Sequence, residues 1–257
     1  MKPKTKLIIK ISVVTALLAM AYSVFASLNG SMIKKFVITS KVKDYVAKTY
    51  IGQPFEVEFC QYNFKTMSYY CYVQSTASED THFTVWEDED GMADDYERSV
   101  TGRENTLFRL SVSLSEYVEQ LFRSIYPHPT SNVFCDTSEN VSEKEISQLT
   151  LDMPFDVKNF PLSTTLMVWV ETSNEKPTWE ELGIRFRELE KLTRDELPCV
   201  EYYSIWLQDK YVEKDGELQP ANYNSEVCAY NVPREVIIGN NLEDYLSKVK
   251  AALEADL

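Results

Sequence analysis

The sequence predicts an α+β protein with an N-terminal transmembrane helix followed by two small units. Three observations predict this class: an uncharged run fills residues 11–28, β-like runs recur along the chain, and segments with helical spacing flank them. We expect helices packed on small, mostly antiparallel sheets, in the order α-β-β-β-α and then α-β-α-β-β-α. With 257 residues, of which 44% are hydrophobic, the chain has enough apolar side chains for two cores.

The first 30 residues form either a transmembrane anchor or a signal peptide. Four lysines precede the uncharged run from Ile11 to Leu28, and the first acid is Asp44. About 18 apolar residues is the lower limit for a helix that crosses the hydrocarbon core. The lysines favour a cytoplasmic N-terminus, so we expect a single-pass protein of the cell membrane with the bulk of the chain extracytoplasmic. Cleavage is the alternative, because Val24-Phe25-Ala26 resembles a signal-peptide cleavage site.

The first unit is expected over residues 31–126. Apolar positions from Ile33 to Tyr50 follow one helical face, and Gly52 and Pro54 end that helix. Ser113 and Glu116 form a capping box that predicts a second amphipathic helix, which ends at Ile125. Between the helices the pattern predicts a meander of three strands, at 55–60, 69–73 and 82–86.

A linker is predicted over 127–141, where prolines and small polar residues resist regular structure. The second unit then occupies 142–257, with capped helices starting near Ser142, Thr178 and Asn241. The apolar run 166–170 is expected to be a strand covered on both faces. Two further strands, at 199–207 and 227–232, flank a turn that contains Asp215-Gly216.

Part of this order resembles the YfjL-like family. The resemblance lies in the basic anchor, the helix at 42–46, the aromatic strand that runs into an acidic turn at 82–91, and the following Asp94-Asp95-Tyr96. The resemblance implies an uncharacterised, membrane-anchored or exported protein of a Gram-positive envelope with an α+β fold. It implies no catalytic residue.

Charge and motif content exclude several functions. The chain has 26 Lys and Arg against 40 Asp and Glu, a net charge of −14, and the part after residue 30 carries −18. Such a chain is a poor nucleic-acid binder, because nucleic acids require clustered positive charge. Only His82 and His128 are present, and the sequence has no H-E-x-x-H, G-x-S-x-G or phosphate-binding glycine loop. We therefore expect no cofactor other than a hard cation.

The acidic turn at 87–95 is the candidate binding site. Its carboxylates Asp88, Asp90, Asp94 and Asp95 surround Gly91, and Ca²⁺ prefers several closely spaced oxygen ligands. A calcium site at Asp88, Asp90 and Asp94 is one hypothesis, although the spacing does not match an EF-hand loop. The other is a solvated turn whose charges protect a strand edge.

Five cysteines leave at least one without a partner in the chain. If the first hairpin turns at Lys65-Thr66, Cys60 and Cys71 lie directly opposite each other, at a separation close to that of a disulfide. Two buried thiols are the alternative. Cys199 and Cys228 flank the second expected hairpin and are a further candidate pair, which leaves Cys135 as the odd thiol.

The expected function is a membrane-anchored extracytoplasmic binding or interaction module of unknown ligand, non-enzymatic, with a protein partner in the envelope. Strand aromatics would form either core or an exposed binding surface; the candidates are Tyr69, Tyr70, Tyr72, Tyr202, Tyr203 and Trp206. The alternative is a carboxylate-dependent cell-envelope hydrolase with a cleft between the two domains.

Overall fold

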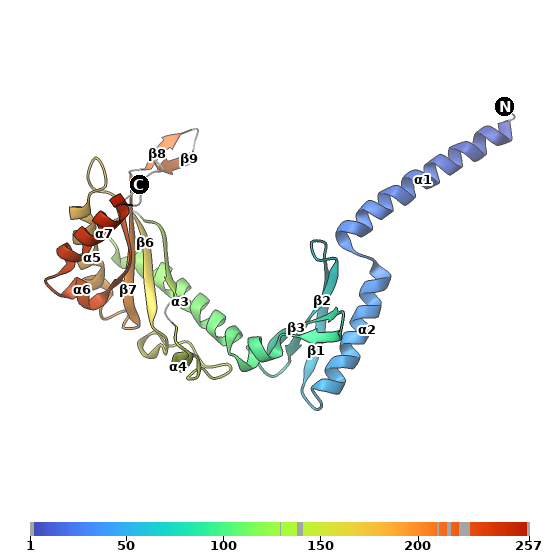
Figure 1. The fold of residues 1–257 in the computed structure, drawn as a ribbon, viewed down its shortest axis with the longest axis horizontal. Coiled ribbons are helices and arrows are strands. Elements are labelled where there is room, and N and C mark those ends of the chain that lie inside the picture. Colours follow the sequence, from blue (N-terminus) through green and yellow to red (C-terminus); the bar gives the residue numbers. More distant parts are fainter. Residues whose placement is uncertain are drawn as a thin grey trace. The chain divides into compact units, whose positions relative to one another are not determined.

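The computed structural model describes residues 3–128, 130–137, 141–209, 211–214, 217–220 and 227–255 (Figure 1). It divides into two compact units, Met1–Asn105 and Thr106–Leu257. Each unit packs helices on a four-stranded sheet. The α+β class expected from the sequence is therefore confirmed.

Helix α1, Pro3–Asn29, is the apolar N-terminal segment. Its described apolar side chains, among them Leu17, Met20 and Phe25, are exposed. Within Ser12–Thr49 an 18-residue window has a mean hydropathy of 1.6, so the helix is long and apolar enough to cross a membrane. A signal sequence near an N-terminus has the same properties. The helix therefore suits an anchor or a signal sequence.

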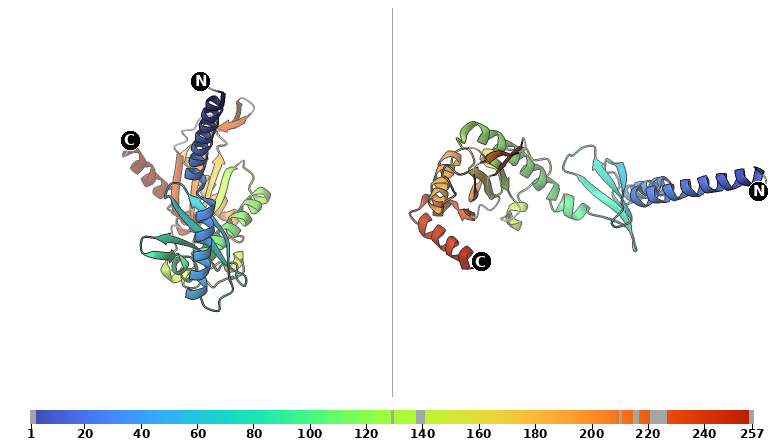
Figure 2. Two further views of the ribbon diagram at one scale, coloured as in Figure 1. Left: turned by 90° about the vertical axis from the view of Figure 1, so that its right-hand side faces the viewer. Right: turned by 90° about the horizontal axis from the view of Figure 1, so that it is seen from above.

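Helix α2, Met32–Thr49, matches the helix expected at 33–50. Ser31 caps it, because its side chain accepts a hydrogen bond from the Lys34 backbone N–H. Ile38, Val42 and Val46 recur on one side and are buried against the first sheet, across which α2 lies (Figures 1 and 2).

The first sheet confirms the expected meander and adds a strand. Its order is β1-β2-β3-β4, all antiparallel, with bounds Phe55–Asn63, Ser68–Ser75, His82–Asp88 and Gly91–Asp94. Alternation buries Cys71, Val73, Phe83 and Val85 beneath α2. The extra strand β4 was expected to be part of an acidic turn. It pairs with β3, placing Asp94 opposite Val85.

Helix α3, Glu104–Ile125, follows the π-helix η1, Glu97–Thr101. The expected start near Ser113 is wrong, since Ser113 and Glu116 lie inside the helix. The apolar period continues backward from Leu114 through Leu110 to Leu107, so the helix is longer than its capping pattern indicated.

The second unit has a mixed sheet in the order β10-β7-β6-β5. Strands β6 and β7 are parallel and joined through α5, whereas the two outer pairings are antiparallel. Strands β8 and β9 form a separate pair, and the expected turn Asp215-Gly216 lies outside the described residues. The bounds are β5 Thr130–Asp136, α4 Glu143–Ile146, η2 Val157–Asn159, β6 Thr164–Glu171, α5 Trp179–Thr193, β7 Val200–Gln208, β8 Tyr211–Lys214, β9 Glu217–Pro220, β10 Val227–Pro233, α6 Arg234–Ile238 and α7 Leu242–Ala255.

A large apolar core lies between the helices and the sheet of this unit, and a smaller cluster forms around Leu110, Leu149 and Leu162. Side chains of α3, α5, α6 and α7 pack on one face of the sheet, and α5, α6 and α7 gather beside its strands in Figure 1. Thr178 caps α5 by accepting from the Glu181 backbone N–H at 3.1 Å, and Ser142 with Glu145 forms the expected capping box of α4. The fully buried apolar strand residues are Leu166, Val168, Val170, Val200, Tyr203, Ile205, Leu207, Ala229 and Val232.

The expected linker at 127–141 does not separate the units. Strand β5 occupies nearly half of it and pairs with β6, while Pro129 and residues 138–140 lie outside the described residues. The units divide between Asn105 and Thr106 instead. Proline at a strand end is compatible with an edge strand, and β5 is an edge strand of its sheet.

The cysteines follow the expected register in the first unit only. Cys60 pairs with Cys71 across β1 and β2, and a disulfide joins them with 4.0 Å between their Cα atoms. Cys199 and Cys228 do not meet, because Cys228 lies opposite Trp206 while Cys199 precedes the other end of β7. Cys135 is a buried free thiol in β5.

Candidate functional site

The acidic turn of the first unit is a short hairpin end. Asp88 and Gly91 close it as a pair, and Asp88 accepts a hydrogen bond from the Asp90 backbone N–H at 2.9 Å. Asp88 and Asp90 are both exposed. The bond between them is a local Asx-type turn, an ordinary role for aspartate.

Asp94 and Asp95 accept hydrogen bonds within the unit. The hydroxyls of Tyr45 and Tyr50 donate to one oxygen of Asp94 at 2.7 and 2.8 Å. Burial and the adjacent Asp94 raise the pKa of both tyrosines, so these hydroxyls stay protonated donors. Asp95 accepts from the Thr84 backbone N–H at 2.6 Å. Both aspartates thus tie the end of β4 to its neighbours.

The structure does not bring the calcium candidates Asp88, Asp90 and Asp94 together. Asp94 lies three residue pairs from the Asp88–Gly91 closure, about 10 Å along the strand. The residues that the structure describes contain no group of three or more His, Cys, Asp or Glu side chains that could hold a metal ion. The four candidate carboxylates therefore do not converge on one ligand.

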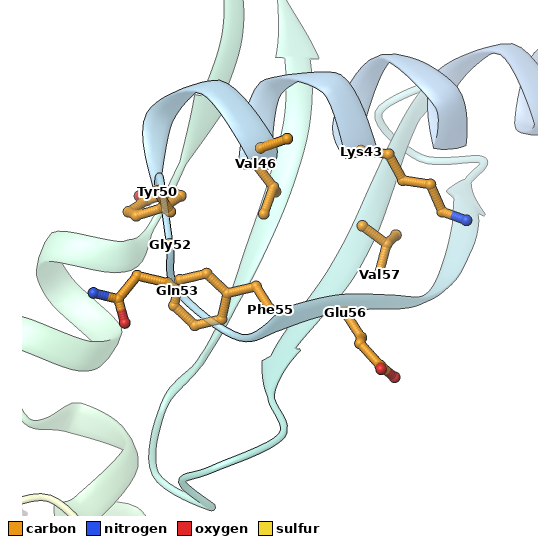
Figure 3. A pocket seen from close by; sticks show the side chains of 9 residues that line it. Lys43, Val46, Tyr50, Gly52, Gln53, Phe55, Glu56 and Val57 are labelled. Carbon is orange, nitrogen blue, oxygen red and sulfur yellow. The ribbon is translucent and has the colours of Figure 1, made fainter.

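A cavity of about 510 Å³ lies between α2 and β1 (Figure 3). Tyr50, Phe55 and Val57 contribute apolar walls, while Lys43 and Glu56 lie on opposite sides. Only one of its lining residues is an acid. One acid does not make the carboxylate pair of a glycoside-hydrolase site.

A row of four aromatic side chains crosses the second sheet on the face opposite the helices. We call Phe134, Trp169, Trp206 and Tyr230 the aromatic row; they come from β5, β6, β7 and β10 in spatial order. The rings of Trp169 and Trp206 stack with centroids 3.9 Å apart and planes 5° apart. Phe134 stacks on Trp169 at 5.7 Å, and Tyr230 meets Trp206 edge to face at 4.8 Å.

Strand alternation places this row outside the core. Val168 and Val170 point into the core on either side of Trp169, and Ile205 and Leu207 do the same around Trp206. The parallel register sets the two tryptophans side by side. Of the run at 166–170, expected to be covered on both faces, Leu166, Val168 and Val170 are fully buried in the core, whereas Met167 and Trp169 on the other face are partly buried and lie outside the apolar core cluster.

The four rings of the aromatic row contact one another, and the row includes one hydroxyl group, that of Tyr230. Trp169 lies between Trp206 and Phe134, and Trp206 lies between Trp169 and Tyr230, so neither indole is free as a platform for a sugar ring. The Trp206 indole N–H donates to the Tyr230 oxygen at 3.0 Å, and burial and the Cys228 contact raise the Tyr230 pKa. Tyr230 remains 50% exposed. An apolar, rigid surface of this kind is typical of protein-binding sites.

Sequence reasoning found this surface only in part. Trp206 and Tyr202 were candidates, but Tyr203 lies in the core, and Phe134, Trp169 and Tyr230 were missed. The available signal was at least one aromatic residue in each of four strands at positions of the outward parity. The strand order needed to align them is not readable from the sequence.

A buried polar network lies at the start of α5. Glu181, 4% exposed, accepts from the Ser173 backbone N–H and hydroxyl at 2.8 Å, from Arg185 at 3.0 Å and from the Thr172 hydroxyl. Burial alone would raise the pKa of Glu181, but these donors outweigh it and lower the pKa to about 2. Arg185 is also only 4% exposed, and its guanidinium forms further hydrogen bonds with Glu188 and His128. The network orders the loop after β6.

Other carboxyls with a shifted pKa also favour the ionised form. Hydrogen bonds from Arg194 and Arg234 lower the pKa of Glu190 despite its burial, and those of Glu145, Asp156 and Glu243 are lowered as well. A general acid in a glycoside hydrolase needs the opposite shift. These residues thus act as hydrogen-bond and ion-pair acceptors.

The fold and site define an α+β protein whose apolar first helix and disulfide suggest secretion or membrane anchoring. The chain belongs to the YfjL-like family: residues 4–91 match the YfjL-like N-terminal domain, and residues 113–247 match the YfjL-like C-terminal domain. Comparison with curated proteins and with solved structures gives no match.

Proposed function

We propose that the chain is a membrane-anchored extracytoplasmic interaction module, not an enzyme, and that its second unit binds a protein of the cell envelope through the aromatic row. The observation that carries the proposal is the row itself. It crosses all four strands of one sheet and lies outside the core. Rigid aromatic clusters of this kind supply most of the binding energy in many protein interfaces.

The net charge of the chain indicates which kind of protein partner it would bind. The chain beyond residue 30 has a net charge of −18, which repels nucleic acids and other polyanions and attracts basic proteins. The ring contacts within the aromatic row argue for a protein surface over a carbohydrate, because neither indole is free as a platform for a sugar ring. Helix α1, read as an uncleaved anchor, would hold this surface near the membrane.

Site-specific photocrosslinking in the native membrane tests the proposal. A photoreactive residue at Tyr230, 50% exposed in the row, is compared with one at Ile184, 60% exposed on α5. We expect a discrete adduct from position 230 only, and its loss in the Trp206→Leu background. Equal adducts from both positions, or an adduct that Trp206→Leu leaves intact, would contradict the proposal.

A further inference from the structure

Most of the exposed large apolar side chains of the first unit lie at one end of it. Eight large apolar residues between Ser31 and Asn105 are strongly exposed, and six of them lie in two short segments. We call these six the α2–hairpin patch; they are Met32, Ile33, Phe36 and Val37 at the start of α2, and Phe64 and Met67 in the β1–β2 turn. Met32, Ile33, Phe36 and Met67 are each at least 77% exposed.

The fold brings the two segments together at the end of α1. The Tyr69 hydroxyl accepts from the Ser31 backbone N–H at 2.5 Å and lies 3.2 Å from the Ser31 carbonyl. Gly30 has φ +73°, and a Cβ there would lie 2.5 to 2.8 Å from atoms of Tyr62 and Tyr69. Figure 1 shows the β1–β2 turn and the start of α2 at the end of the unit where α1 arrives.

The four patch residues on α2 do not face the sheet. Met32 and Phe36, like Ile33 and Val37, are one turn apart on the helix, whereas the buried positions Ile38, Val42 and Val46 lie on another side. Past Val37 the exposed positions of α2 turn polar, with Ser40, Lys41 and Lys43. The apolar exposure is therefore confined to the two turns nearest α1.

The two segments that form the patch carry a charge opposite to that of the whole chain. Residues 31–43 and 61–69 contain five lysines and no acid. Glu87, at the acidic end of the β3–β4 hairpin, forms an ion pair with Lys41 of α2. Because Tyr70 pairs with Trp86, this acidic end lies beside the β1–β2 turn in the sheet, so the lysines of the patch also face these carboxylates.

We propose that the α2–hairpin patch docks on the bilayer surface from which α1 emerges. The inference rests on the proposed function, in which α1 is an anchor. Apolar and aromatic side chains enter the headgroup region, and Lys34, Lys35 and Lys65 meet lipid phosphates, as in interfacial amphipathic segments. The membrane would then hold the first unit in a fixed pose, which a free tether would not.

Tryptophan quenching by brominated lipids in vesicles that contain the full chain tests this pose. Phe64→Trp places a probe in the patch, and Ile51→Trp is the matched control, since Ile51 is an 82% exposed apolar residue past the other end of α2. The four native tryptophans are common to both variants. We expect about a twofold quenching of the added Phe64→Trp signal, because interfacial groups lie about 5–10 Å deep, and none of the added Ile51→Trp signal.

Flotation of the same vesicles separates this inference from the proposed function. If the chain floats with the vesicles but Phe64→Trp is no more quenched than Ile51→Trp, docking is wrong and anchoring stands. If the chain does not float, both are wrong. Met67→Trp is a second probe in the same turn, so the result does not depend on a single variant.

Discussion

Glu181→Gln tests the buried network of α5. The network gives Glu181 a pKa of about 2 instead of its ordinary 4.5. That difference corresponds to about 3 kcal/mol of folding free energy, since each pKa unit is worth about 1.4 kcal/mol. Because the side chain is only 4% exposed, solvent screening reduces this figure little.

The sign follows from the lowered pKa. The ionised form is the one that the folded state prefers, so the stabilisation is fully present above pH 4.5 and is lost as the pH falls from 4.5 towards 2. A glutamine cannot ionise and removes this contribution at every pH. We therefore expect Glu181→Gln to destabilise the second unit by about 3 kcal/mol at pH 7 and by much less near pH 2.

Urea unfolding of the full chain between pH 2.5 and 7, followed by tryptophan fluorescence, measures the difference. Glu180→Gln is the control, because Glu180 is the exposed neighbour in the same helical turn, where a change costs less than about 0.5 kcal/mol. A gap between wild type and Glu181→Gln that stays constant over this pH range would refute the assigned role of the network.

Three further predictions concern the first unit and the free thiols. Replacing both Cys60 and Cys71 with alanine should cost about 3 kcal/mol in urea unfolding, because the disulfide closes a loop with a sequence separation of 11; an unchanged midpoint would contradict this. Gly30→Ala should cost more than about 1 kcal/mol, since a positive φ disfavours alanine and the tyrosines leave no space for its Cβ, whereas wild-type stability would show that the junction is loose. Burial raises the pKa of the Cys135 thiol, so maleimide should label it at least about tenfold more slowly than half-buried Cys228 in the native protein, and equal rates would be inconsistent with the core.

Local patterns predicted the elements that depend on local forces. The period of 3.6 marked α2, the Ser142 capping box marked α4, and the alternation around Cys60 and Cys71 set a hairpin register that the structure confirms. These features depend on residues within a few positions of one another, and a single sequence contains that information.

The failures involve contacts between distant segments. The 127–141 segment was expected to be a linker because of its prolines, yet β5 forms there by pairing with β6, some 30 residues later. The aromatic row needs four strands from positions 134 to 230 in the right order. In the acidic turn the carboxylate density predicted a ligand set, and the structure adds that Asp94 accepts hydrogen bonds from Tyr45 and Tyr50, a contact between distant segments.

Protease treatment of intact protoplasts carrying the C-terminally tagged chain tests the central claim most directly, namely that α1 stays in the membrane with both folded units outside. The account predicts that external protease removes the tag from intact protoplasts while the tagged protein remains in the membrane fraction of untreated ones. A tag that is protected until the protoplasts are lysed would place the units inside the cell and contradict the account.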